Sequence, residues 1–146
     1  MSKIYVASSW RNTDYPAVVK ALLRAGHEVY DFREGNGNFH WKFIDPQWRN
    51  WTPKQFAEGL THQVAKDGFE CDYAALEWAD TCVLVLPCGR SAHLEACYMA
   101  GSGKQTVIYM PELAEAELMY KLLGPIVFSR RNLVAYLGDN IGKASS

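Results

Sequence analysis

A chain of 146 residues, 49% hydrophobic and 21% charged, has the composition of one globular domain with a buried core, so we do not expect a disordered protein. The formal net charge of −1 gives no electrostatic basis for general binding to nucleic acid or to an anionic membrane surface. No apolar run approaches the ~20 residues that a membrane-spanning helix needs, so we expect no membrane segment.

The chain enters an apolar strand at residue 4, which leaves no room for a signal peptide and predicts a cytoplasmic protein. Its four cysteines show no CxxC spacing, and a domain of this size does not need disulfides, so we expect reduced thiols. The four histidines are scattered without the spacing of metal ligands, and no zinc site is predicted.

Five apolar segments alternate with helical segments along the chain. Asp14 can cap the first helix, which has Pro16 in its first turn and Gly26 as its stop. The run from Thr81 to Leu86 is typical of a strand that is buried on both faces. We expect strands at 4–7, 27–32, 81–86, 105–110 and 126–129, helices at 14–26, 53–65, 69–78, 91–100, 113–123 and 132–137, and a frayed tail at 142–146.

This alternation predicts a single domain over residues 1–146 with an α/β fold. The expected architecture has three layers and is doubly wound, with a five-stranded parallel sheet in the flavodoxin-like order 2-1-3-4-5. In that order the first and third strands are neighbours, so the loops after Ala7 and Leu86 face each other. Ligands of open α/β sheets bind at such a switch point.

Residues 33–52 differ from the rest, because glycines and asparagines open the segment and five aromatic residues follow. A loop of this length in a compact domain is usually functional. Trp41 in this loop and Trp10 after the first strand offer flat surfaces for a planar ring. A purely structural aromatic cluster explains several of these residues equally well.

Glu95 lies in the first turns of the helix that follows the central strand and its glycine-containing loop. An acid there can simply interact with the positive end of the helix, worth ~0.5 kcal/mol. Its place at the switch point favours function. A carboxylate is a competent nucleophile at an anomeric carbon, where it forms a glycosyl ester that a second acceptor resolves.

Two further residues have both a structural and a functional interpretation. Tyr5, within the first strand, is either a core aromatic or the donor of a hydrogen bond that orients the Glu95 carboxylate and keeps it ionised. Asp72, on the helix before the central strand, is either solvated or positioned to exchange a proton with a leaving nucleobase.

Three stretches stand in a fixed order: Lys3-Ile4-Tyr5-Val6-Ala7 followed by Trp10, then Asp72 with Leu76 and Ala79-Asp80, then Glu95-Ala-Cys-Tyr-Met-Ala-Gly-Ser-Gly-Lys104. Together they resemble the nucleoside 2-deoxyribosyltransferase family, which includes the related nucleotide N-glycoside hydrolases. The resemblance runs from residue 3 to about residue 123. Its most specific part is the segment from Glu95 to Lys104.

The resemblance implies that Glu95 is the nucleophile, that Tyr5 orients it and that Asp72 serves the base. The N-glycosidic bond of a nucleoside or nucleotide would be cleaved with retention, and the glycosyl-enzyme would pass to another base or to water. This chemistry implies no metal and no organic cofactor. The family also implies a homo-oligomer, at least a dimer, for which the helix from Leu94 to Met99 offers a hydrophobic surface.

The loop before Glu95 departs from the family. The transferases carry an acid six positions before the nucleophile, where this chain has Gly89, and some nucleotide hydrolases have a serine there for the 5′-phosphate. Arg90 and Ser91 follow, and with the amides at the helix start they can bind a phosphate, although Ser91 equally suits an ordinary N-cap. Glu117 replaces the Asn of a segment that reaches the neighbouring subunit's site in the transferases. The substrate-binding set that we predict is Ser8, Trp10, Trp41, Gly89, Arg90, Ser91 and Glu117.

Two alternative functions remain open. A flavodoxin-like flavin-binding protein is one, because residues 8–13 weakly resemble its phosphate loop, but they lack the glycine for close backbone approach. A nucleotide-sensing module without turnover is the other. A single-stranded nucleic-acid binder is disfavoured, because aromatic stacking normally accompanies a positive groove.

Overall fold

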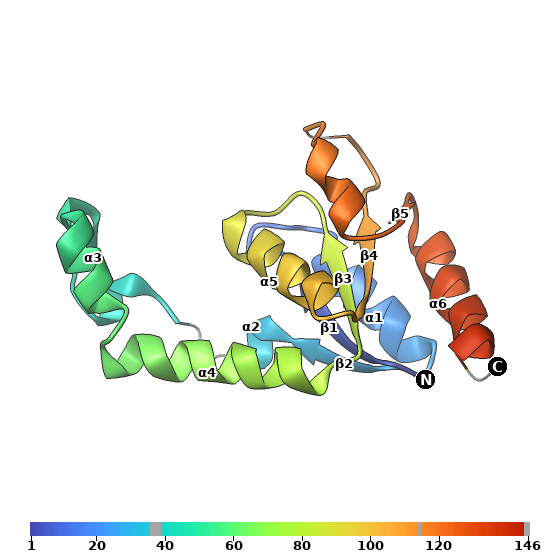
Figure 1. Ribbon diagram of the computed structural model, residues 1–146, viewed down its shortest axis with the longest axis horizontal. Helices are drawn as coiled ribbons and strands as arrows, with labels where there is room; N and C mark the ends of the chain where they lie inside the picture. The colour runs from blue at the N-terminus through green and yellow to red at the C-terminus, as the bar shows by residue number, and fades with distance from the viewer. Residues whose placement is uncertain (36–38, 114, 145–146) are drawn as a thin grey trace.

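A single sheet of five parallel strands forms the centre of the molecule (Figure 1). The computed structural model describes residues 1–35, 39–113 and 115–144, and describes residues 139–144 by their backbone alone. The strand order is β2-β1-β3-β4-β5, so the predicted fold class is confirmed. The strands are β1 (Lys3–Ala7), β2 (Glu28–Asp31), β3 (Thr81–Val85), β4 (Gln105–Tyr109) and β5 (Ile126–Val127).

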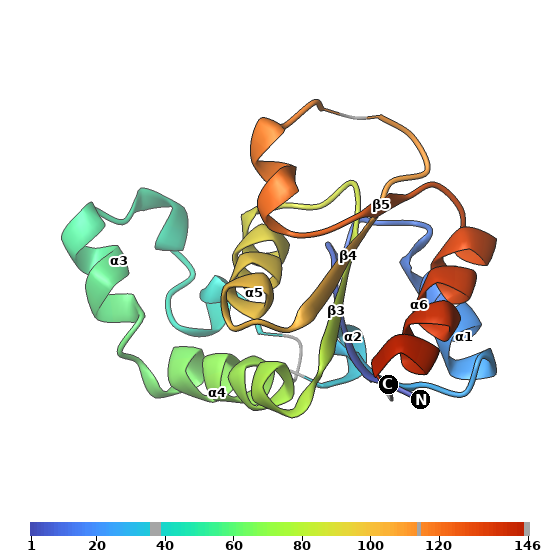
Figure 2. The same cartoon turned by 45° about the vertical axis from the view of Figure 1, so that its right-hand side comes forward.

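Helices cover both faces of the sheet, which gives the three layers (Figure 2). α1 (Tyr15–Arg24) and α6 (Arg130–Ala144) lie on one face, and α4 (Gln63–Trp78) and α5 (Arg90–Gly101) lie on the other. All five residues of β3 are buried, because this central strand has a helical layer on either side. In the described part of the chain, no helix is long and apolar enough to cross a membrane.

Alternation along the strands assigns each side chain to one of the two layers. Along β1, Ile4 and Val6 pack toward α1 and α6, whereas Tyr5 and Ala7 point toward α4 and α5. Tyr5 therefore belongs to the layer that also contains Glu95 of α5. Within the sheet Tyr5 is paired with Tyr30 of β2 on one side and with Cys82 of β3 on the other.

The predicted loop at 33–52 is largely helical and leads into an arm that extends away from the sheet (Figure 1). Trp41 packs against three rings of the arm, those of Phe39, Trp51 and Phe56, at centroid distances of 4.9, 6.0 and 5.6 Å. These residues form a small aromatic core of their own, as the structural interpretation expected. The elements here are α2 (Phe32–Gly35), η1 (Trp41–Phe43), η2 (Trp48–Asn50) and α3 (Pro53–Gly59).

Several predicted helix boundaries are wrong. α3 ends at Gly59, and α4 starts at Gln63, where the His62 side chain accepts a hydrogen bond from the Val64 amide and caps the helix. Among the described residues of the helix expected at 113–123, only η3 (Leu118–Leu122), a 3-10 helix, forms. The terminal helix continues to Ala144, so the expected fraying at 142–144 is wrong, and residues 145–146 lie outside the described residues.

Asp14 precedes α1 as predicted, but its side chain does not cap the helix. The Asn12 side-chain oxygen instead accepts from the amides of Asp14 (2.9 Å) and Tyr15 (2.8 Å). The Asp14 carboxylate accepts from Arg130 at 2.7 Å and from the Tyr109 hydroxyl at 2.5 Å. Asp14 therefore links the start of α1 to β4 and α6 rather than closing its own helix.

Gly124, before β5, is the glycine whose environment most clearly excludes a side chain. Its φ is +156°, and an added Cβ would lie 2.0 Å from the Thr106 carbonyl oxygen. We expect Gly124→Ala to lower the free energy of unfolding by about 1–3 kcal/mol, because the backbone must move to relieve this overlap. Gly138→Ala in α6 is the matched control: its Cβ meets nothing within 4 Å, and alanine favours a helix. Urea unfolding checks both, and equal stabilities of the two variants would contradict the prediction.

Candidate active site

The predicted pair of Tyr5 and Glu95 is in direct contact. The Tyr5 hydroxyl, from β1, donates a hydrogen bond to the Glu95 carboxylate, from α5. Tyr5 has no solvent exposure, and Glu95 is partly buried. The contact forms because strand alternation directs Tyr5 toward the layer of α5, while Glu95 lies on the side of α5 that faces the sheet.

Asp72 of α4 lies beside this pair through a second tyrosine. The Tyr30 hydroxyl donates to the Asp72 carboxylate at 2.9 Å. The rings of Tyr30 and Tyr5 stack with their centroids 5.3 Å apart and their planes at 24°. The structure thus brings together all three residues predicted to be catalytic, and it adds Tyr30, which was not predicted.

The surroundings of Glu95 disfavour the charged form of its carboxyl. Burial raises the pKa of Glu95 to about 7; the hydrogen bond from Tyr5 opposes this, and the negative charge of Asp72 adds to it. Burial, together with the Glu95 charge, also raises the pKa of Tyr5, so its hydroxyl remains a donor. Strongly shifted carboxyl groups that have a specific polar partner are typical of functional sites.

The loop between β1 and α1 is fixed by its own hydrogen bonds and by Arg33. The Ser8 hydroxyl donates to the Val85 carbonyl at 2.9 Å, which holds the ends of β1 and β3 together. The Arg33 guanidinium donates to the carbonyls of Ser9, Trp10 and Asn12 at 3.0, 3.1 and 2.8 Å. Arg33 was also not predicted, although its place just after β2 puts it at the same edge of the sheet.

Trp10, in this loop, is half exposed and available to a ligand at that edge. Its ring is nearly perpendicular to that of Phe32 at a centroid distance of 5.5 Å, and the Arg33 guanidinium lies 5.6 Å from the Trp10 ring centre. Trp41, by contrast, is engaged in the aromatic core of the arm, and no described contact joins it to Glu95 or Asp72. Binding of the substrate by Trp41 therefore stays a prediction without a contact to support it.

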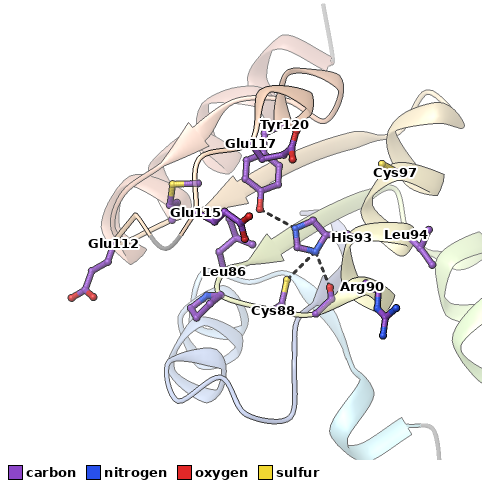
Figure 3. A pocket seen from close by; sticks show the side chains of 13 residues that line it. Leu86, Cys88, Arg90, His93, Leu94, Cys97, Glu112, Glu115, Glu117 and Tyr120 are labelled. Carbon is purple, nitrogen blue, oxygen red and sulfur yellow. Dashed lines mark hydrogen bonds between the residues drawn. The ribbon is translucent and has the colours of Figure 1, made fainter.

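A cavity of about 560 Å³ lies on the other side of α5 (Figure 3). Three predicted substrate-binding residues line it: Gly89, Arg90 and Glu117. The positions 90, 93, 94 and 97 of α5 that face it are nearly opposite position 95 on a helix, and neither Glu95 nor Tyr5 is among its lining residues. The predicted site residues are therefore divided into two groups by α5.

His93 fixes the walls of this cavity. One ring nitrogen lies 2.7 Å from the Gly89 carbonyl and the other 2.9 Å from the Tyr120 hydroxyl of η3, and the His93 and Tyr120 rings stack (Figure 3). Cys88 lies 3.7 Å from His93, but burial raises the pKa of its thiol to about 12, so it is no nucleophile at neutral pH. All four cysteines are free thiols, as expected.

The remaining predicted binding residues have structural roles that are now visible. Gly89 is the N-cap of α5, so Ser91 is not the cap and lies exposed in the first turn. The Glu117 side chain caps η3 by accepting from the Met119 amide at 2.9 Å. Arg90, the first residue of α5, is exposed. Among the described residues, no group of three or more His, Cys, Asp or Glu side chains is placed to hold a metal ion.

Neither a protein-family model nor a curated protein matches the sequence, but solved structures do. A 2-deoxyribosyltransferase from Bacillus psychrosaccharolyticus aligns with a TM-score of 0.66 at 20% identity, over 91% of this chain and 90% of that one. The chain has the fold of a 2-deoxyribosyltransferase. A conserved protein from Enterococcus faecalis aligns with a TM-score of 0.64 at 15% identity, over 96% of this chain and 99% of that one. A CMP N-glycosidase from Clostridium botulinum aligns with a TM-score of 0.51 at 14% identity, over 92% of this chain and 97% of that one.

The buried carboxyl of Glu95 makes stability depend on pH. Because its pKa is raised to about 7, the folded protein binds more protons than the unfolded chain between about pH 4.5 and pH 7, so stability falls as the pH rises through that range. We expect Glu95→Gln to raise the free energy of unfolding by about 3 kcal/mol at pH 8 and by little at pH 4.5, since the pKa of Glu95 rises from 4.5 to about 7 and one pKa unit corresponds to about 1.4 kcal/mol. Urea unfolding at both pH values measures this.

Glu77→Gln is the matched control for that measurement. Glu77 also accepts a hydrogen bond from a tyrosine, Tyr98, but it is exposed on α4. Its replacement should change stability little at either pH. A Glu95→Gln variant whose stability follows the wild-type pH dependence would show that the Glu95 carboxyl is not the group that titrates.

Proposed function

We propose that this chain is an enzyme that cleaves the N-glycosidic bond of a nucleoside or nucleotide, with Glu95 as the nucleophile. The observation that carries the proposal is the hydrogen bond from the Tyr5 hydroxyl to the Glu95 carboxylate, with Asp72 close enough to raise the pKa of Glu95. This is the arrangement that the resemblance to the 2-deoxyribosyltransferase family implies. The shared fold with a 2-deoxyribosyltransferase and a CMP N-glycosidase supports it.

In the first step a Glu95 oxygen attacks C1′ of the sugar and the C1′–N bond breaks, with its electron pair going to the base. Asp72 enters this step with a proton taken up from solvent, and its carboxyl gives that proton to the departing base. In the second step an acceptor base or water attacks C1′, the glycosyl ester breaks, and the acceptor's proton returns to Asp72. Both steps invert C1′, so the net result is retention.

The surroundings of the pair suit these roles. Tyr5 donates to one Glu95 oxygen, so the carboxylate is oriented in its ionised, nucleophilic form. Ser8 joins the ends of β1 and β3, and exposed Trp10 offers a face for a base at the same edge. Arg90 and Ser91, at the start of α5, are the candidates for a 5′-phosphate.

A homo-oligomer also belongs to this proposal. Leu94 of α5 and Leu118 and Leu122 of η3 are exposed by 71%, 75% and 64%. Of the surface expected on α5, Leu94 and Tyr98 are exposed, whereas Met99 is buried in the core. An oligomer that covers these leucines would also enclose the cavity beside α5.

We expect Glu95→Ala and Glu95→Gln to abolish base release while the protein stays folded, because each removes the nucleophile. The assay incubates a panel of nucleosides and 5′-monophosphates, with and without a free acceptor base, and follows base release by chromatography; the acceptor arm separates a transferase from a hydrolase. Glu77→Gln is the control, with turnover like that of the wild type. Unchanged turnover in the Glu95 variants would refute the proposal.

We expect Tyr5→Phe to lower kcat by ~10- to ~100-fold, since it removes a supporting hydrogen bond but not the nucleophile. The pH profile of kcat/KM gives a sharper readout. Because the Tyr5 hydrogen bond lowers the pKa of Glu95, its loss should move the acidic limb of the profile to higher pH. Tyr98→Phe, at the exposed pair with Glu77, should leave the profile in place. An acidic limb that does not move in Tyr5→Phe would assign it to another group.

A further inference from the structure

Tyr30 stands in the same relation to Asp72 as Tyr5 does to Glu95. The two tyrosines are register partners on adjacent strands, their rings stack at 5.3 Å, and each hydroxyl donates to a different carboxylate. Two stacked tyrosines therefore donate hydrogen bonds to both acids of the site. The resemblance to the family supplied a role for Tyr5 but none for Tyr30.

The phenol of Tyr30 is itself held in place. An added Cβ at Gly35 would lie 2.5 Å from its hydroxyl oxygen, so the end of α2 packs directly on the ring. The Cys71 sulfur lies 3.6 Å from the same hydroxyl, while the Cys71 thiol donates to the Gly35 carbonyl at 2.8 Å. Burial and these neighbours raise the pKa of Tyr30, so it is a hydrogen-bond donor throughout the neutral range.

We propose that Tyr30 is a positioning residue for proton transfer: it fixes the Asp72 carboxyl toward the departing base, as Tyr5 fixes Glu95 toward the sugar. This inference rests on the proposed function, in which Asp72 gives its proton to the base and regains one from the acceptor. Asp72 lies on a helix, with its carboxyl able to rotate about two bonds. A hydrogen bond from a partly buried, stacked ring restricts that rotation.

A positioning role for Tyr30 and a purely structural role predict different effects on different substrates. Tyr30 acts on the proton and not on the nucleophile, so its loss should matter only where the base needs a proton to leave. The base of an N7-methylated purine nucleoside or of nicotinamide riboside leaves as a neutral molecule without one. A structural defect would slow ordinary and cationic substrates alike.

The first experiment measures kcat and KM of Tyr30→Phe on the best nucleoside or nucleotide of the panel, and on N7-methylguanosine and nicotinamide riboside. On the ordinary substrate we expect kcat to fall ~10- to ~100-fold with little change in KM, because the interaction assists the transition state. On a cationic substrate that the wild type cleaves we expect a change below about threefold. Equal losses on both kinds of substrate would overturn the proposal.

The second experiment is a double-variant cycle on the ordinary substrate alone. If Tyr30 acts through Asp72, then Tyr30→Phe should add almost nothing to the loss in Asp72→Asn. Fully multiplicative losses would overturn the proposal. Tyr15→Phe is the matched control: the Tyr15 hydroxyl also donates to an aspartate, Asp31, at 2.9 Å, but on the opposite face of the sheet, and its loss should be multiplicative with Asp72→Asn.

These measurements distinguish failure of the proposed function from failure of the inference about Tyr30. If the wild type releases no base from any nucleoside or nucleotide, the proposed function is wrong and Tyr30 loses its role with it. If the wild type does release base and Tyr30→Phe has the same kcat as the wild type on the ordinary substrate, only the inference about Tyr30 is wrong. Thermal unfolding of Tyr30→Phe beside Tyr15→Phe shows whether the two substitutions disturb the fold equally.

Discussion

The structure of the site depends on keeping a carboxyl group out of water beside a second acid. Transfer of an unpaired carboxylate from water is costly, and a like charge nearby increases that cost. Here the Tyr5 hydroxyl meets Glu95 and the Tyr30 hydroxyl meets Asp72, so each acid has a neutral donor. Burial still raises the pKa of Glu95 to about 7 against the opposing effect of the Tyr5 hydrogen bond, so this carboxyl exists in both protonation states at physiological pH.

That constraint explains why the site lies where it does in the sheet. The helical layer of α4 and α5 contributes the acids, and the strands beneath it contribute the phenols. Tyr5 can reach Glu95 only because β1 and β3 are neighbours in the order 2-1-3-4-5, with α5 following β3 directly. α5 also separates the cluster of Tyr5, Glu95 and Asp72 from the cavity that Gly89, Arg90 and Glu117 line.

Much of this was predictable from the sequence, and the rest was not for physical reasons. The buried run at β3 and the glycine-ended helix α5 have strong local signals, so the fold and the pair of Tyr5 and Glu95 could be inferred. Tyr30 depends on the register between two strands, and Arg33 on the path of a loop, which no local pattern specifies. Substrate binding by Trp41 stays a prediction, because an aromatic residue in a long loop looks the same in the sequence whether it binds a ligand or packs against other rings of the arm.

The pairing of Tyr5 with Tyr30 limits which sequence changes the site can accept during evolution. Successive side chains of a strand point to opposite faces, so a shift of β2 by a single residue would exchange Tyr30 for Val29 or Asp31 and leave Asp72 without its phenol. An insertion or deletion within β2 would thus remove the hydrogen bond to Asp72 without changing Tyr5, Glu95 or Asp72. Variation should therefore be accepted at the tip of the arm long before it is accepted in this short edge strand.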